Sequence, residues 1–386
     1  MKPALKTKSK IVLTLLVILL LVSLLTVFGA PAYYLWLLAV LVTGFPLLFI
    51  GVTCILLVSL FWIKKYRVIS AIIGVLALIF FCSPVMRAYL VSKVIKTEFN
   101  AAFGLGSTHL TGDKSQPAFS FSGLFTTYGI KPGDYKTFAY GGGSTQTLDF
   151  YPSRVAGKRP CIIIVHGGSW SSGDSKQLPE LNSLLAHAGY NVASINYRLA
   201  PKFQAPLAIT DVEQAFIYLR KNAGTLSIDT NNFVLLGRSA GAQIALLSAY
   251  KYPQNGLKGV IDFYGPADMV WGYSAPASKL IMDSRAVMER YLGGTYKTVP
   301  DKYFANSPIE FVNRQSVPTL IIHGDNDVLV SPVHSQKLNK KLRDNGIKHY
   351  YLNLPWATHG FDYNINGPGG QLSTYLVERF ISTVCK

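Results

Sequence analysis

The sequence predicts an α/β protein with a mainly parallel, doubly wound sheet, preceded by about three transmembrane helices. The sheet is predicted because short apolar runs alternate with helix-forming segments from residue 135 onward, and because these runs are apolar throughout. Continuously apolar strands are typical of parallel sheets that helices cover on both faces. The transmembrane helices are predicted because residues 1–96 contain three long, uncharged apolar runs.

These apolar runs predict helices over about 11–28, 33–63 and 68–86. Each run is long enough to cross a bilayer, which favours a membrane segment over 1–96 against buried helices of a soluble protein. The second run is too long for one straight crossing. We expect Gly44-Phe45-Pro46 to kink it, because proline removes a helix hydrogen bond. Splitting it there would leave a first half, 33–43, that is too short to span.

The charge of the chain is concentrated in this segment. The chain has 37 Lys and Arg against 20 Asp and Glu, and residues 1–96 hold ten of the basic residues and no acidic one. Residues 97–386 are therefore much closer to balance. We interpret the basic composition as a topology signal, and we expect no nucleic-acid partner.

Basic residues that flank membrane helices prefer the cytoplasm. The N-terminal lysines and the 64–67 loop should therefore lie inside, and the uncharged connection 29–32 outside. Three crossings then make the protein a multi-pass cell-membrane protein whose residues 97–386 lie on the extracytoplasmic side. In an alternative interpretation, residues 1–32 form a cleaved signal peptide, and the large domain ends on the same side.

We expect residues 97–134 to form a linker that packs on its own domain, with 119–125 as a candidate cap or membrane contact. The α/β domain covers 135–386, and its longest irregular insertion, 266–307, is a candidate cap. The four cysteines give no disulfide framework. The expected strands are 135–140 and 147–151 (a hairpin), 161–165, 191–197, 233–236, 259–264, 319–323 and 350–354. The expected helices are 179–188, 209–222, 242–249, 334–344 and 371–384.

The motif Gly237-Arg238-Ser239-Ala240-Gly241 stands between the strand 233–236 and the helix 242–249. A G-x-S-x-G motif between a strand and a helix is typical of a strained turn that exposes a nucleophilic serine. The two glycines omit side chains that would collide in such a turn. The helix start also directs free N–H groups and a positive dipole end toward a developing oxyanion. Ser239 is therefore the candidate nucleophile.

A serine nucleophile needs a base and an acid that orients the base. His359 follows the last strand, which places it at the carboxyl edge of the sheet beside the motif, and it is the candidate base. His323 ends a strand but is followed by Gly324, which indicates a turn. Asp327, one step further into the loop after that strand, is the candidate acid, whereas Asp325 is better placed to cap the turn.

An oxyanion needs N–H groups that are fixed before the reaction. The sequence His166-Gly-Gly-Ser-Trp170 follows the strand 161–165, and its glycines let the backbone approach a substrate closely. We predict that Gly167, Gly168 and Ala240 supply these N–H groups.

Residues from about 135 to 386 resemble the α/β-hydrolase superfamily, and most of all its hormone-sensitive-lipase and carboxylesterase branch. The resemblance rests on these motifs, on the order Ser239, Asp327, His359, and on Tyr197-Arg-Leu-Ala-Pro201, Asp211 and His359-Gly-Phe361. Ser169 replaces the third glycine of that branch. The resulting His-Gly-Gly-x-Trp is similar to small esterases and arylformamidases. In the family Arg198 and Asp211 are structural.

The resemblance implies a serine hydrolase that cleaves carboxylic esters, as a carboxylesterase or lipase, with Ser239, Asp327 and His359 as its triad. Its partners would be a small-molecule or lipid ester and the lipid bilayer. No cofactor or metal is expected. An amidase or aminopeptidase on the same fold remains an alternative. A binding protein on a hydrolase scaffold is disfavoured because all three triad residues are present.

Overall fold

The computed structural model describes residues 3–105, 117–125, 133–143 and 145–385. Its central sheet has eight strands in the order β1-β2-β4-β3-β5-β6-β7-β8. Strands β3 to β8 pair in parallel, and β1 and β2 add an antiparallel edge. This sheet confirms the predicted mainly parallel α/β fold. The strands are β1 Lys136–Ala139, β2 Thr147–Tyr151, β3 Arg159–Val165, β4 Asn191–Ile195, β5 Ile228–Arg238, β6 Leu257–Phe263, β7 Thr319–Gly324 and β8 His349–Leu354.

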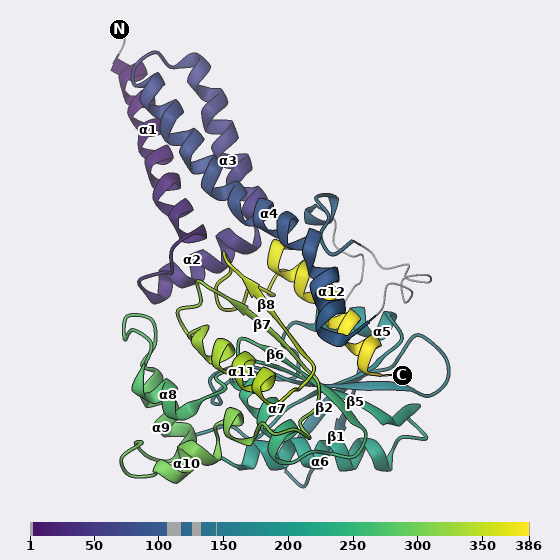
Figure 1. Ribbon diagram of the computed structural model, residues 1–386. Coiled ribbons are helices and arrows are strands. Elements are labelled where there is room, and N and C mark those ends of the chain that lie inside the picture. Colours follow the sequence, from purple (N-terminus) through teal and green to yellow (C-terminus); the bar gives the residue numbers. More distant parts are fainter. Residues whose placement is uncertain (1–2, 106–116, 126–132, 144, 386) are drawn as a thin grey trace.

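Helices cover both faces of this sheet (Figure 1). They are α5 Pro179–His187, α6 Leu207–Lys221, α7 Ala240–Lys251, α11 Val333–Asp344 and α12 Pro368–Val384. Successive residues of one strand belong to opposite cores: in β5, Phe233 and Leu235 pack with α6, α7 and α11, whereas Val234 and Leu236 pack with α5 and α12. Burial on both faces explains why the central strands are apolar throughout.

The insertion 266–307 folds into three short helices: α8 Met269–Ser274, α9 Ser284–Leu292 and α10 Pro300–Ala305. Asp268 and Asp283 cap the first two, each accepting a hydrogen bond from a backbone N–H two or three residues into the helix. The helices lie side by side beyond the carboxyl ends of the strands (Figure 1). This insertion therefore covers the edge of the sheet that carries the candidate site.

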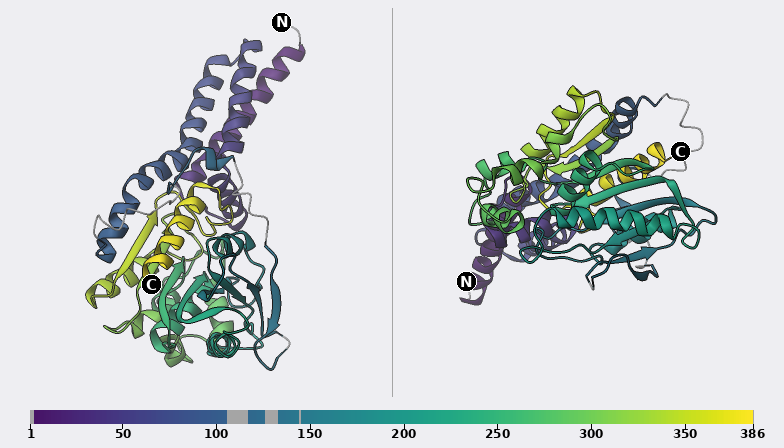
Figure 2. Two further views of the ribbon diagram at one scale, coloured as in Figure 1. Left: turned by 90° about the vertical axis from the view of Figure 1, so that its right-hand side faces the viewer. Right: turned by 90° about the horizontal axis from the view of Figure 1, so that it is seen from below.

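The N-terminal residues form a helical bundle that projects from one end of the α/β domain (Figure 2). It contains α1 Pro3–Ser23, α2 Tyr33–Gly44, α3 Pro46–Ser59 and α4 Arg67–Phe103. The segments 7–26 and 67–103 are each long and apolar enough to cross a membrane, and the bent pair of α2 with 46–62 would be a third candidate. Residues Gly44-Phe45-Pro46, where a kink is expected, turn the chain by 86°.

The helix that is expected over 68–86 continues to Phe103 and leaves the bundle to pack on the α/β domain. Its C-terminal part buries Ile95, Phe99 and Phe103 in the core that also contains α12 and β8. The ring of Phe99 stacks on Phe103 at 4.5 Å and meets Tyr350 of β8 edge-on at 5.9 Å. One continuous helix therefore joins the bundle to the sheet.

Residues 117–125 of the linker also pack on these two helices. Ser120 N donates to Gln371 Oε1 of α12 at 2.8 Å, and the ring of Phe121 lies 5.5 Å from that of Tyr89 in α4. The remaining linker residues, 106–116 and 126–132, lie outside the described part of the chain.

Truncating Phe99 tests whether the end of α4 belongs to the α/β core. Because this side chain is fully buried, Phe99→Ala should lower the free energy of unfolding by about 3–5 kcal/mol. Val94→Ala, at an exposed position of the same helix, should change it by less than about 0.5 kcal/mol. Denaturant titration of the two purified variants measures both values. Equal stabilities would contradict this packing.

Candidate active site

Ser239 stands in a strained turn between β5 and α7, with φ 55° and ψ −121°. The turn is sterically possible because both flanking residues are glycines. A Cβ on Gly237 would lie 2.3 Å from the Gly241 carbonyl oxygen, and a Cβ on Gly241 would lie 2.3 Å from the carbonyl oxygens of Val165 and His166. The turn is also fixed by a hydrogen bond from Ser239 N to the carbonyl of Phe263 in β6. It therefore presents the hydroxyl at the carboxyl edge of the sheet.

The structure brings Ser239, His359 and Asp327 into one hydrogen-bonded chain. His359 Nε2 lies 3.0 Å from Ser239 Oγ, and His359 Nδ1 lies 2.7 Å from Asp327 Oδ2. The three residues come from the β5–α7 turn and from the loops that follow β8 and β7. This is the geometry of a nucleophile, a base and a carboxylate that orients the base.

Asp327 is held by more partners than the base alone. Its Oδ1 accepts from the backbone N–H groups of Leu329 and Val330 at 2.9 Å each, and its Oδ2 also faces His323 Nε2 at 3.1 Å. Asp325, in contrast, is exposed and accepts only from Asn353 among the described residues. The carboxylate that meets His359 is therefore the one predicted.

The environment of Asp327 keeps its carboxyl ionised. Burial alone would raise its pKa, but the charge of His359 and the hydrogen bonds from His323 and His359 together hold the pKa below its usual value. Burial would also lower the pKa of His323, and the hydrogen bond and charge of Asp327 outweigh this and raise it. The sequence predicts that His323 shapes a turn, whereas the structure shows that it contacts Asp327. The four-residue spacing between the two is the sequence feature that could have indicated this contact.

The backbone groups around Ser239 differ from the predicted oxyanion set at one position. Gly167 N already donates to Gln177 Oε1 at 2.8 Å. The N–H groups of Gly168, Ser169 and Ala240 have no hydrogen-bond acceptor among the residues that the structure describes. In this conformation Gly167 is engaged elsewhere, and the free donors beside Ser239 are those of Gly168, Ala240 and the neighbouring Ser169.

The loop that carries these donors is held in an unusual conformation. Gly168 has φ 120°, and Ser169 and Trp170 have φ 54° and 58°. Trp170 secures it, because its indole N–H donates to Gln243 Oε1 of α7 at 2.9 Å and its ring stacks on Tyr291 of the cap at 4.5 Å. The Trp of His-Gly-Gly-x-Trp thus fixes the loop to the helix that follows Ser239.

A buried ion pair fixes the His359 loop to the same turn. Arg238, next to Ser239, bonds Asp362 at 2.6 Å, and Tyr264 donates its hydroxyl to the same carboxylate at 2.6 Å. The ring of Tyr264 also packs on His359, with the ring centroids 4.3 Å apart. Sequence reasoning missed this set, since nothing in the local pattern pairs Arg238 with a residue 124 positions later. Arg198 and Asp211, which the family resemblance assigns structural roles, form an ion pair at 2.7 Å, and neither lines the two pockets at Ser239.

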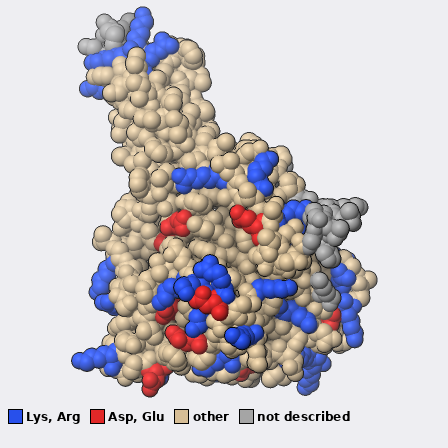
Figure 3. Space-filling model, in the orientation of Figure 1, with Lys and Arg blue, Asp and Glu red and all other residues tan. Residues whose placement is uncertain are grey.

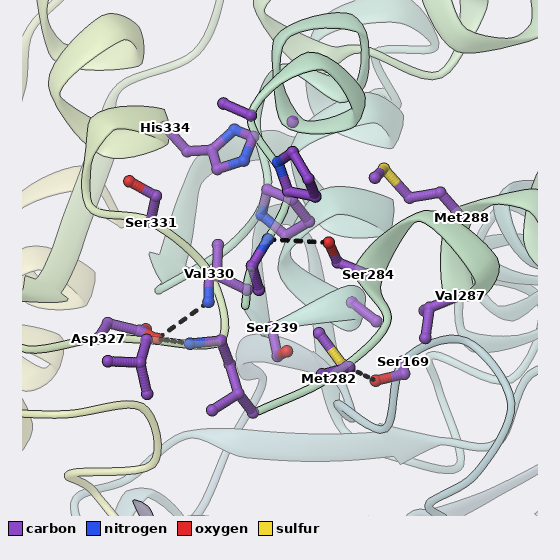
Figure 4. A pocket seen from close by; sticks show the side chains of 18 of the residues that line it. Ser169, Ser239, Met282, Ser284, Val287, Met288, Asp327, Val330, Ser331 and His334 are labelled. Carbon is purple, nitrogen blue, oxygen red and sulfur yellow. Dashed lines mark hydrogen bonds between the residues drawn. The ribbon is translucent and has the colours of Figure 1, made fainter. Parts of the chain in front are cut away.

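Two pockets meet at Ser239. The cap-side pocket has a volume of about 130 Å³ and lies between the cap and the 327–331 loop, with Met282, Val287, Met288 and Val330 on its walls (Figure 4). The α2-side pocket, of about 370 Å³, is lined by Tyr33, Trp36, Gly168, His359 and Tyr363 among others. Ser169, Ser239, Met282 and Leu329 line both pockets. A substrate with two arms could therefore lie across the serine.

Among the described residues there is no cluster of three or more His, Cys, Asp or Glu that could hold a metal ion.

Comparisons with known proteins find relatives of the α/β domain. Residues 148–342 match the model of the BD-FAE family. The chain is 30% identical over 278 residues to esterase LipQ and 30% identical over 267 residues to esterase LipC, both from Mycobacterium tuberculosis; these matches cover 66% and 64% of this chain. They span 65% of LipQ and 64% of LipC.

Solved structures of the same fold include carboxyl esterase 2 from Tuber melanosporum. It has a TM-score of 0.57 and 19% sequence identity, with 67% of this chain and 90% of that chain covered. At this identity the likeness concerns the fold alone. The bundle residues 1–96 lie outside the family match.

Asp262, near the end of β6, is a further buried carboxyl, and it interacts electrostatically with His323. It is fully buried, its Oδ1 accepts from Gly265 N at 2.8 Å, and its Oδ2 has no partner in the described part of the chain. Burial raises its pKa to about 7, against the opposing effect of His323. Between pH ~4 and ~7 the folded protein therefore binds more protons here than the unfolded chain, so stability falls as pH rises through this window.

Asp262→Asn should remove this pH dependence, because the amide keeps the shape and does not titrate. We expect the melting temperature of the wild type to fall from pH 5 to pH 8 by at least about 3 °C more than that of Asp262→Asn, or roughly 1 kcal/mol for a domain of this size. Thermal unfolding in detergent at both pH values measures the difference. Asp301→Asn, at an exposed carboxyl, should follow the wild type. Parallel curves for wild type and Asp262→Asn would contradict the assignment.

Proposed function

This chain belongs to the BD-FAE family, and we propose that it is a membrane-anchored serine hydrolase of carboxylic esters. The observation that carries this proposal is the hydrogen-bonded chain Ser239 Oγ–His359–Asp327 beside unengaged backbone N–H groups. The two curated relatives named as esterases support the choice of esters. A complete triad favours catalysis over the binding-scaffold alternative.

In the first half of the reaction His359 Nε2 takes the proton of Ser239 as Oγ attacks the ester carbonyl carbon. The carbonyl oxygen becomes an oxyanion, which Gly168 N, Ser169 N and Ala240 N are available to bind. Asp327 orients the imidazole and stabilises its charged form. When the tetrahedral intermediate collapses, the carbon–oxygen bond to the alcohol breaks, and His359 gives its proton to the departing oxygen.

In the second half the acyl group is esterified to Ser239 Oγ. His359 takes a proton from water, the resulting hydroxide equivalent attacks the acyl carbon, and the second tetrahedral intermediate releases the acid. The proton on His359 returns to Ser239 Oγ, which restores the free enzyme.

The membrane part of the proposal rests on the bundle. On the face that Figure 3 shows, the bundle carries no Lys, Arg, Asp or Glu between its tip and the α/β domain, whereas Lys and Arg gather at the tip. Residues 11–63 contain no charged residue, and the basic 64–67 loop follows them. We propose that the tip faces the cytoplasm and the hydrolase domain the extracytoplasmic side, in accordance with the preference of basic residues for the inside.

Labelling with a fluorophosphonate tests the nucleophile. The wild type should be labelled on Ser239, as located by mass spectrometry, and Ser239→Ala should neither be labelled nor hydrolyse a short-chain ester above about 0.1% of the wild-type rate. Labelling at another residue, or a folded wild type without label, would contradict the proposed mechanism.

The role of Asp327 can be separated from that of its neighbour Asp325. Asp327→Asn should lower kcat by about 10⁴-fold, because an amide in that place favours the wrong imidazole tautomer. Asp325→Asn, at the exposed carboxyl of the same loop, should keep kcat within about threefold. Steady-state hydrolysis of one soluble ester by both variants measures this contrast, and a similar loss in the two would argue against the assignment.

A further inference from the structure

The short helix α2 forms one wall of the α2-side pocket, although it belongs to the membrane segment. Tyr33 and Trp36 line this pocket together with Gly168, Ser239 and His359. No part of α2 lies within the family match at 148–342. The bundle therefore supplies part of the surface that a substrate would touch.

Specific contacts hold α2 against the site. Trp36 Nε1 donates to the carbonyl of His359 at 3.2 Å, and Tyr33 N donates to the carbonyl of Leu280 in the cap insertion at 2.9 Å. At the other end of the helix, Asn364 Nδ2 donates to the carbonyl of Gly44 at 2.7 Å. The helix is thus fixed to the loop of the candidate base and to the cap, and its position relative to Ser239 is defined.

The opposite face of α2 is apolar and exposed. Tyr34, Leu37, Leu41 and Phe45 at its end are 42–81% exposed. The helix lies across the base of the bundle, at 86° to the following helix, where the bundle meets the α/β domain (Figure 1). An apolar helix in that plane is suited to the surface of a bilayer that the bundle crosses, and tyrosine is enriched there.

The position of His359 indicates which arm of an ester lies beside α2. The base must protonate the departing alcohol oxygen, so that oxygen has to lie near His359 Nε2. Among the described residues that line the two pockets, His359 belongs to the α2-side pocket and not to the cap-side pocket. The alcohol arm is therefore directed toward α2, and the acyl arm toward the smaller cap-side pocket.

The lining of the α2-side pocket favours an uncharged ligand. Among the described residues that line it, Arg238 is the one Lys, Arg, Asp or Glu, and its guanidinium is paired with Asp362. The remaining lining is aromatic and aliphatic, with hydroxyl and amide groups such as Ser172 and Gln177, and Tyr33 and Tyr363 at 44% and 52% exposure. Such a surface suits a neutral head with an apolar tail.

From these observations we infer that the substrate is an ester of an uncharged, amphiphilic alcohol that resides in the membrane. Its alcohol arm reaches Ser239 from the bilayer surface along Tyr33 and Trp36. This inference rests on the proposed ester hydrolysis and on the proposed membrane anchoring.

The experiment compares two esters that share the acetyl group and the glyceryl linkage. The full chain is reconstituted in phosphatidylcholine vesicles, and release of labelled acetate is measured from 3-acetyl-1,2-dioleoylglycerol in the same vesicles and from water-soluble glycerol monoacetate. We expect kcat/KM to be at least about tenfold higher for the lipid ester. Tyr33→Ala should lower this ratio at least about tenfold, and Trp36→Phe should lower it in the same direction.

Tyr252→Ala is the matched control, because it removes an exposed tyrosine at the end of α7 that lines neither pocket. It should keep the ratio of the wild type. Fluorophosphonate labelling of each variant reports whether the site is folded. An active, labelled wild type that does not prefer the lipid ester, or labelled variants that lower both rates equally, would overturn the inference and leave the proposed function standing. A wild type without label and without acetate release would instead overturn the proposed function.

Discussion

The strained turn at Ser239 is the constraint on which the arrangement of the site depends. A serine at φ 55° and ψ −121° is uncommon for a residue with a side chain, and such strain persists only where the surroundings impose it. They do so here because β5 is central in the sheet and α7 packs back on it, with Gly237 and Gly241 at the crossing. The same crossing brings the N-terminus of α7, with the free N–H of Ala240, beside the hydroxyl.

Two buried charged groups, the Asp327 carboxylate and the Arg238–Asp362 pair, fix the rest of the site. The carboxylate of Asp327 has no solvent contact, so it must be satisfied by the protein, and two backbone N–H groups and two histidines do this. An ionised, fully bonded carboxylate leaves His359 one orientation, with Nε2 toward Ser239. The Arg238–Asp362 pair has a similar effect on the His359 loop, since breaking it would leave a buried charge without a partner.

Sequence reasoning succeeded where the signal is local and periodic. Continuous apolar strands predict the sheet, and the structure confirms it. The three residues of the candidate triad were proposed because each follows a strand, and the structure brings their side chains into one hydrogen-bonded chain. It did not find contacts that depend on tertiary packing. Gln177 accepts the hydrogen bond of Gly167 N, and Asp362 pairs with Arg238. The local sequence pattern around these residues predicts neither contact. The end of the long helix α4 was also placed early. Hydropathy falls at Arg87, but the helix continues to Phe103, and the left-handed Gly104 that follows, with φ 65°, ends it.

The bend at Gly44-Phe45-Pro46 lets α2 lie against the candidate active site, which the local sequence does not predict. A kink was expected because proline cannot continue the hydrogen-bond ladder, but proline sets no direction for the preceding helix. The direction follows from the partners at the two ends of α2: the Leu280 carbonyl binds its start, and Asn364 binds the Gly44 carbonyl at its end. Trp36 also donates to the His359 carbonyl, so α2 is tied directly to the loop of the candidate base. The N-terminal bundle and the candidate catalytic groups therefore share one set of contacts, and α4, packed on β8, limits how far the bundle and the α/β domain can shift against each other.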